Sequence, residues 1–155
     1  MDDLSDLYQE IILSHNKRPR NQGELENATG DAEGYNPLCG DRIHVWVHQD
    51  DAGKVDDIAF TGEACAICTA STSIMTEAVK GKSREEIDAK AAEALEMLTS
   101  KEEPTFDLLE QGDFAALAGV RQFPARIKCA TLGWHTLESA LKGDGETVNT
   151  EKEEG

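Results

Sequence analysis

The fold is constrained most strongly by a change from strand periodicity to helix periodicity near residue 62. Residues 41–48 alternate between apolar and other side chains, which predicts a strand with one face in the core. A turn containing Asp and Gly separates it from a predicted return strand over residues 55–61. In this antiparallel hairpin, the start of the first strand and the end of the second lie at the same end of the sheet.

The order of elements is one helix, then strands, then helices only. This order predicts an α+β domain with an antiparallel sheet and helices gathered on one face. Residues 1–142 form the predicted single domain, with a polar excursion at 99–112. Residues 143–155 are rich in Gly and charge and form a predicted disordered acidic tail. The predicted helices cover residues 4–15, 65–80, 83–98, 113–117 and 124–141.

The charge of the chain argues against several classes of partner. Its 155 residues include 31 acidic and 15 basic side chains, a formal net charge of −16. Such a surface repels phosphate, so neither nucleic acid nor an anionic membrane is expected as a partner. No apolar run approaches the roughly 20 residues of a membrane-spanning helix. The acidic, amphipathic opening lacks the pattern of a signal peptide, and we therefore expect a soluble, cytoplasmic protein.

The acidity itself has two interpretations. One is an ordinary acidic cytosolic protein. The other is adaptation to high salt, in which a dense carboxylate surface stays hydrated while salt screens its self-repulsion. The acid-rich runs at 50–51, 56–57, 102–103 and 151–154 favour the second interpretation, a halophilic source.

Four cysteines are the main candidates for chemistry. In a reducing compartment they are expected to be metal ligands, nucleophiles or buried thiols in preference to disulfides. Cys39 precedes the first strand of the hairpin and Cys65 follows the second, so the fold brings them close together. Cys129 lies in the first turns of the last predicted helix, after Arg126.

Asp41 adds a carboxylate two residues after the first of these thiols. Three thiols at junctions between loops and regular elements, with one carboxylate, complete a tetrahedral set: Cys39, Asp41, Cys65 and Cys129. Zinc suits this set, and so does one end of an iron–sulfur cluster. The helix start at Cys65 and the positive charge of Arg126 before Cys129 both favour the thiolate form.

The remaining cysteine, Cys68, forms a C-x-x-C pair with Cys65. At helical spacing the two thiols lie on neighbouring faces. Cys68 is therefore a fourth thiol ligand, a redox partner or a small buried residue, and the sequence leaves all three open. The four histidines, none of them beside a cysteine, are expected at the surface or in satisfied positions.

Four ordered segments together resemble the NifU N-terminal/IscU family of iron–sulfur cluster assembly proteins. The signature with the first cysteine, the Gly-x-x-Cys segment, the turn after the opening helix and the third-cysteine segment all have counterparts there. They are NPLCGD at 36–41, GEACAI at 62–67 with TASTS at 69–73, HNKRPRN at 15–21 and FPARIKCATLGW at 123–134. The resemblance covers about residues 4–142. It implies a SufE/NifU-like fold: a three-stranded antiparallel sheet, helices on one face and a metal site at one end.

Within the family, two features resemble the SufU branch. The chain between Cys65 and Cys129 carries an insertion that the IscU branch lacks, with residues 112–120 as its core. The IscU branch has a histidine immediately before the third cysteine, whereas this chain has Lys128. Cys68 departs from the SufU pattern, which more usually has a small non-cysteine residue there.

The resemblance implies a zinc-dependent sulfurtransferase. Its zinc would be held by Cys39, Asp41, Cys65 and Cys129, and a SufS-like, PLP-dependent cysteine desulfurase would pass persulfide sulfur to Cys39. Arg126 is expected to stabilise the freed thiolate, and a downstream iron–sulfur scaffold would receive the sulfur. The alternative is a scaffold that assembles and transfers a [2Fe–2S] cluster. A structural zinc domain without chemistry is a third hypothesis.

Overall fold

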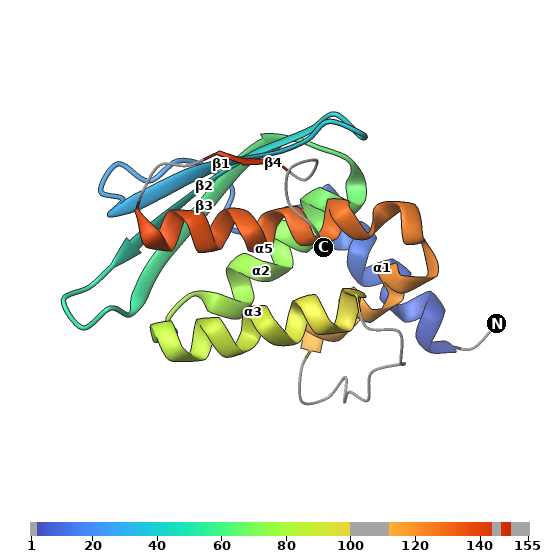
Figure 1. The fold of residues 1–155 in the computed structure, drawn as a ribbon. Helices are drawn as coiled ribbons and strands as arrows, with labels where there is room; N and C mark the ends of the chain where they lie inside the picture. Colours follow the sequence, from blue (N-terminus) through green and yellow to red (C-terminus); the bar gives the residue numbers. More distant parts are fainter. Residues whose placement is uncertain (1–2, 100–111, 144–146, 150–155) are drawn as a thin grey trace.

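The computed structural model describes residues 3–99, 112–143 and 147–149 (Figure 1). A sheet forms one layer and the helices cover one of its faces, so the predicted α+β class is confirmed. The helices are α1 (Asp3–Lys17), α2 (Ala66–Val79), α3 (Arg84–Thr99) and α5 (Ile127–Lys142), with 3₁₀ segments η1 (Gly112–Gln122) and η2 (Pro124–Arg126). None of the helices in these described ranges is both long and apolar enough to cross a membrane.

The sheet has the strand order β3-β2-β1-β4. Its strands are β1 (Gly30–Asn36), β2 (Asp41–Gln49), β3 (Val55–Glu63) and β4 (Val148–Asn149). The first three are antiparallel, so the predicted hairpin and the three-stranded antiparallel sheet are both confirmed. Ile43, Val45 and Val47 of β2 are buried on the helix side, as the alternation predicted.

The two-residue strand β4 was not expected. Val148 and Asn149 lie within the segment predicted as a tail, yet they pair in parallel with Gly34 and Tyr35 of β1. Val148 is also buried, because its apolar side chain joins the core at the sheet edge. Residues 144–146 and 150–155 of that tail, and residues 100–111 of the predicted excursion, lie outside the described residues.

The helices form layers beneath the sheet. Helix α5 packs directly against β1 and β2, and α2 packs against both α5 and α1. Figure 1 shows α3 on the side of α5 away from the sheet, where α3 contacts α5 and η1. The predicted capping box before α3 is present, because Ser83 Oγ accepts from the Glu86 amide and Glu86 Oε1 accepts from the Ser83 amide.

Strand β1 lies unusually close to α5 because of its glycines. A side chain at Gly30 would overlap the carbonyl oxygen of Ala140, and one at Gly34 would overlap the hydroxyl of Thr136. The strand therefore has hydrogens where a strand normally carries apolar side chains. This explains why periodicity did not identify residues 30–36 as a strand.

One buried histidine joins three elements on the helix side. His15, at the end of α1, is fully buried, with Nδ1 2.7 Å from Ser73 Oγ of α2 and Nε2 2.7 Å from Asp113 Oδ2 of η1. This contact fixes the N-terminal helix and η1 to α2. His44 and His48 lie on the outer face of the sheet and contact carboxylates. All three histidines are thus in satisfied positions, as expected.

We predict that Gly30→Ala destabilises the fold by about 1–3 kcal/mol, because the added methyl group meets the backbone of α5, which cannot rotate away. Urea denaturation measures this change. Gly119→Ala is the matched control, since its methyl group meets only the Tyr8 side chain at 3.2 Å. The control should shift stability by no more than about 1 kcal/mol. Equal stability of the Gly30→Ala variant and the unsubstituted protein would contradict the close packing of β1 on α5.

Candidate metal centre

The predicted site residues meet where several elements begin or end at one end of the sheet. Asp41 is the first residue of β2, and Cys39 lies in the turn that joins β1 to β2. Cys65 is the N-cap of α2, directly after β3, and Cys129 lies in the first turn of α5. The antiparallel pairing therefore brings residues together that are up to 90 positions apart in sequence.

Two of the thiols and the carboxylate form a tight group. The ligand atoms of Cys39, Asp41 and Cys129 lie within 4.8 Å of one another. The sulfur atoms of Cys129 and Cys39 are 3.2 Å apart, within hydrogen-bond distance. Asp41 and Cys129 are fully buried, whereas Cys39 is half-buried. Only one thiol of this group is therefore open to an approaching molecule.

Cys65 joins the group through Asp41. Its backbone amide donates to Asp41 Oδ1 at 2.7 Å, and its Sγ lies 3.8 Å from Asp41 Oδ2. The carboxylate thus receives the first free amide of α2 and faces the thiol of the same residue. The structure therefore brings Cys39, Asp41 and Cys129 within metal-binding distance of one another, whereas Cys65 lies outside this tight group and adjoins it through Asp41.

Asn36 is a site residue that the sequence analysis did not select. It is the last residue of β1 and is buried, and its side-chain amide donates to Asp41 Oδ2 and to Cys129 Sγ, both at 3.4 Å. These bonds orient one predicted ligand from β2 and one from α5. Asn36 is part of the NPLCGD signature, but only the contact across 93 positions shows what its side chain does.

Arg126 provides the positive charge at the site. Its guanidinium Nη1 donates to Cys39 Sγ at 3.4 Å, from the end of η2 immediately before α5. A hydrogen bond with Cys129, together with negative charge on Cys65 and Cys39, raises the pKa of Arg126. The guanidinium therefore stays charged beside the most accessible thiol.

The thiols differ in acidity when no metal is bound. A hydrogen bond from the Cys129 thiol lowers the pKa of Cys65 to about 6, and burial acts in the opposite direction. The same interaction, reinforced by burial, raises the pKa of Cys129. In this state Cys65 is the thiolate and Cys129 keeps its proton.

Cys68 lies in the first turn of α2, three residues after Cys65. It is fully buried, and desolvation raises the pKa of its thiol well above the ordinary value. Its backbone amide donates to Cys65 Sγ at 3.4 Å. Among the described residues, no hydrogen bond joins its sulfur to Cys39 or Cys129, so the structure favours the interpretation of Cys68 as a buried thiol outside the ligand set.

The donor set fits a thiophilic metal. Three thiols and one carboxylate are the ligands that tetrahedral zinc accepts, and the Asn36 amide and Cys65 amide supply the outer hydrogen bonds that orient such ligands. The same set also fits one end of an iron–sulfur cluster. The four residues therefore suit either a zinc ion or one end of an iron–sulfur cluster.

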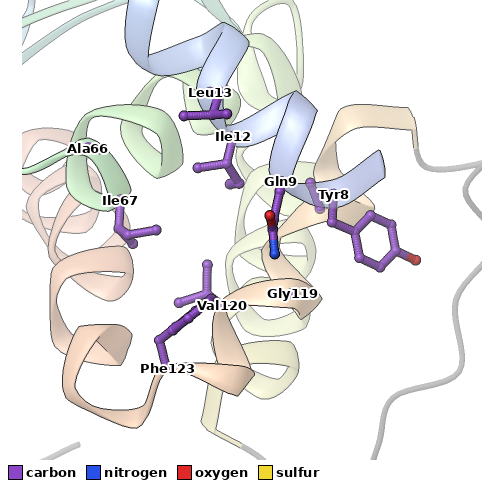
Figure 2. Close-up of a pocket in the computed structure, with 10 residues that line it drawn as sticks. Tyr8, Gln9, Ile12, Leu13, Ala66, Ile67, Gly119, Val120 and Phe123 are labelled. Carbon is purple, nitrogen blue, oxygen red and sulfur yellow. The ribbon is translucent and has the colours of Figure 1, made fainter. Parts of the chain in front are cut away.

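An apolar pocket of about 210 Å³ adjoins the site. In Figure 2, Ile12 of α1, Ile67 of α2, Val120 of η1 and Phe123 point toward a common space. Ile67 is two residues after Cys65, and Phe123 is nearly half exposed. The pocket therefore begins at the first turn of α2, directly after Cys65.

Comparison with known proteins agrees with this architecture. The class defined by the fold and the site is a small α+β protein with a candidate cysteine–aspartate metal site at one end of its sheet. The model of the NifU-like N terminal domain matches residues 7–142. The chain belongs to this family.

Its relatives carry two kinds of name. The chain is 45% identical over 139 residues to an iron–sulfur cluster assembly scaffold protein IscU of Streptococcus pyogenes serotype M1, covering 90% of this chain and 85% of the relative. It is 43% identical over 138 residues to the zinc-dependent sulfurtransferase SufU of Bacillus subtilis, covering 89% of this chain and 91% of the relative.

A solved structure supports the fold. It is described as a putative iron–sulfur cluster assembly scaffold protein for the SUF system from Fervidobacterium islandicum AW-1. It matches with a TM-score of 0.76 and 36% identity, covering 85% of this chain and 94% of that chain. The predicted family is thus confirmed at the level of both sequence and fold.

We predict that, in metal-free protein, alkylation of Cys65 rises with pH through a midpoint near 6, because its thiolate is the reactive form. Cys129→Ala should move this midpoint upward, since the donating thiol is lost. Iodoacetamide labelling across pH, followed by peptide mass spectrometry, measures both. Cys68→Ser is the matched control and should leave the midpoint in place. An unchanged midpoint in Cys129→Ala would contradict the hydrogen bond between these thiols.

Proposed function

We propose that this protein accepts persulfide sulfur from a PLP-dependent cysteine desulfurase for iron–sulfur cluster assembly, with Cys39 as the acceptor. The observation that carries the proposal is the pairing of the half-exposed Cys39 thiol with the guanidinium of Arg126. Arg126 contacts the thiol that a partner protein can reach. The zinc-dependent sulfurtransferase name of the Bacillus subtilis relative supports the same function.

We further propose Cys39, Asp41, Cys65 and Cys129 as the ligands of a zinc ion. Bound zinc would keep the thiols of this set deprotonated and tie the turn after β1 to the starts of β2, α2 and α5. The buried Asp41 and Cys129 are the fixed members of the set, held by Asn36.

Cys39 is the ligand that can move at the lowest cost. It lies in a turn next to Gly40, which has a φ of +71° and open space around it. Cys65 caps α2, and Cys129 is part of α5, so displacing either thiol would disturb a helix. A thiol that must leave the set and return is therefore best placed at Cys39.

The transfer step is a thiolate exchange. The Cys39 sulfur attacks the outer sulfur of the desulfurase persulfide, and a new sulfur–sulfur bond forms. The original sulfur–sulfur bond breaks, and its electron pair remains on the desulfurase cysteine as a thiolate. Arg126 stabilises the negative charge on Cys39 before the attack and on the terminal sulfur of the new persulfide afterwards.

We expect two protein partners and a cytoplasmic setting. The first partner is a SufS-like desulfurase, which must bring its persulfide to the face that carries Cys39 and Arg126. The exposed apolar side chains of Leu38 and Phe123, with exposed fractions of 72% and 47%, lie near these residues in sequence and suit protein contact. The second partner is a downstream iron–sulfur scaffold that takes the sulfur.

Assembly of a [2Fe–2S] cluster on this chain is the second candidate function. The scaffold name of the Streptococcus pyogenes relative favours it. Lys128, which precedes Cys129, is exposed and supplies no imidazole ligand, and this favours the sulfurtransferase. Protein purified without oxygen distinguishes the two: zinc and no colour for sulfur transfer, iron and a brown chromophore for the scaffold.

We predict that incubation with a desulfurase and cysteine adds the mass of one sulfur atom to the tryptic peptide of residues 21–42, which contains Cys39. Cys39→Ser should abolish this adduct, because the attacking sulfur is missing. Arg126→Ala should keep zinc but slow transfer severalfold, and Arg126→Lys should restore part of the rate. Mass spectrometry over time measures each effect.

The matched control is Cys68→Ser, which changes a thiol outside the ligand set. It should keep both zinc and the adduct on residues 21–42. Sulfur found instead on the peptides of residues 55–80 or 129–142, with Cys39 unmodified, would overturn the assignment of the acceptor.

A further inference from the structure

Cys65 and Cys68 form a dithiol pair at the start of a helix. Cys65 is the N-cap of α2, with the extended conformation φ −66° and ψ 166°, and Cys68 follows three residues later in the first turn. The Cys68 amide donates to Cys65 Sγ at 3.4 Å, so the first sulfur lies over the turn that carries the second. This is the arrangement of redox-active C-x-x-C pairs, in which an accessible first thiol caps the helix.

The two thiols differ in access. Cys65 is half-buried, whereas Cys68 has no exposed surface. An oxidant in solution therefore reaches Cys65 first, and Cys68 reacts only with a sulfur that is already beside it. The hydrogen bond from the Cys68 amide already holds Cys65 Sγ over the first turn. A disulfide needs Cβ atoms about 3.5–4.5 Å apart, so the first turn must bring the two residues to that distance.

We propose that Cys65 and Cys68 form a reversible redox pair, in which a hydroperoxide oxidises Cys65 and the buried Cys68 resolves the product to a disulfide. This disulfide takes Cys65 out of the proposed metal set. It also protects the Cys65 sulfur from the higher oxidation states that dithiols do not reverse. The proposed sulfur transfer to Cys39 does not need a bond between Cys65 and Cys68, so the redox pair is a separate property of the site.

The oxidation balances in two steps. The Cys65 thiolate attacks one peroxide oxygen, the oxygen–oxygen bond breaks and hydroxide (or an alkoxide) leaves, giving a sulfenic acid. The Cys68 sulfur then attacks the Cys65 sulfur; a sulfur–sulfur bond forms and the sulfur–oxygen bond breaks. The Cys68 proton leaves with that oxygen as water. Two thiols have lost two electrons, and a dithiol reductant restores them.

A second thiol pair competes for the oxidant. Cys39 and Cys129 have sulfur atoms 3.2 Å apart and would also form a disulfide in metal-free protein. Trypsin separates the two cases, because Cys65 and Cys68 lie on one peptide, residues 55–80. Their disulfide is an internal loop in that peptide. A disulfide between Cys39 and Cys129 instead links the peptides of residues 21–42 and 129–142.

The test treats metal-free full-length protein with hydrogen peroxide, then maps the peptides without reduction. We expect peptide 55–80 to lose the mass of two hydrogen atoms and to recover it after dithiothreitol. Protein loaded with zinc beforehand should react more slowly, because Cys65 is then held by the metal. A peptide that gains only oxygen, or that stays fully reduced while the linked pair forms, would overturn the proposal.

Cys68→Ser provides the decisive comparison, with Cys68→Ala as a second variant if the first does not fold. After peroxide and then dithiothreitol, the unsubstituted protein should rebind about one zinc ion per chain. The variants should recover less of this capacity, because without Cys68 a larger share of the oxidised Cys65 proceeds to sulfinic acid. Equal recovery of zinc binding in the variants and the unsubstituted protein would contradict a resolving role for Cys68.

Discussion

The bonds to the buried carboxylate of Asp41 hold the functional end of the molecule together. Asp41 begins β2, receives the backbone amide of Cys65 at the start of α2, and receives the side-chain amide of Asn36 at the end of β1. Asn36 also bonds to the Cys129 sulfur at the start of α5. A carboxylate without exposed surface is stable only with such donors, so burial and hydrogen bonding at this residue fix where four elements meet.

The meeting of these elements also concentrates negative charge at one end of the molecule. Three thiols that are to act as thiolates lie beside a carboxylate, in a chain whose net charge is −16. Among the described residues, Arg126 supplies the positive charge at this site. Its guanidinium donates to the Cys39 sulfur from the exposed side. A bound cation would balance the remaining charge, so we expect the donor set to be more stable with a metal than without one.

The hairpin and the long helices could be predicted because their periodicity is local. The alternation around Val45 and the capping box before α3 needed no knowledge of distant residues. The cysteine placement followed from the hairpin, since antiparallel pairing brings Cys39 and Cys65 to one end. Strand β1 could not be predicted in this way. Gly30 and Gly34 allow α5 to pack close to the strand, and glycine at these positions leaves no alternation of apolar side chains to recognise.

The site was predicted less completely than the fold, because part of it depends on contacts between residues that are far apart in the sequence. Its ligand types could be recognised from local spacing, and their motifs resembled those of a known family. Asn36 was missed because its two partners lie on other elements, one of them on the last helix. The strand at Val148 depends on an edge of the sheet that exists only after β1 has folded.

X-ray absorption spectroscopy of the zinc-loaded, full-length protein identifies the atoms that bind the metal. We predict three sulfur ligands at about 2.3 Å and one oxygen ligand at about 2.0–2.2 Å, because Asp41 completes the set with the three junction cysteines. Asp41→Ala should leave the three sulfur ligands and replace the carboxylate oxygen by water. Four sulfur ligands in the unsubstituted protein would show that Cys68 takes the place of Asp41, and two or fewer would contradict the convergence of the three thiols on one metal.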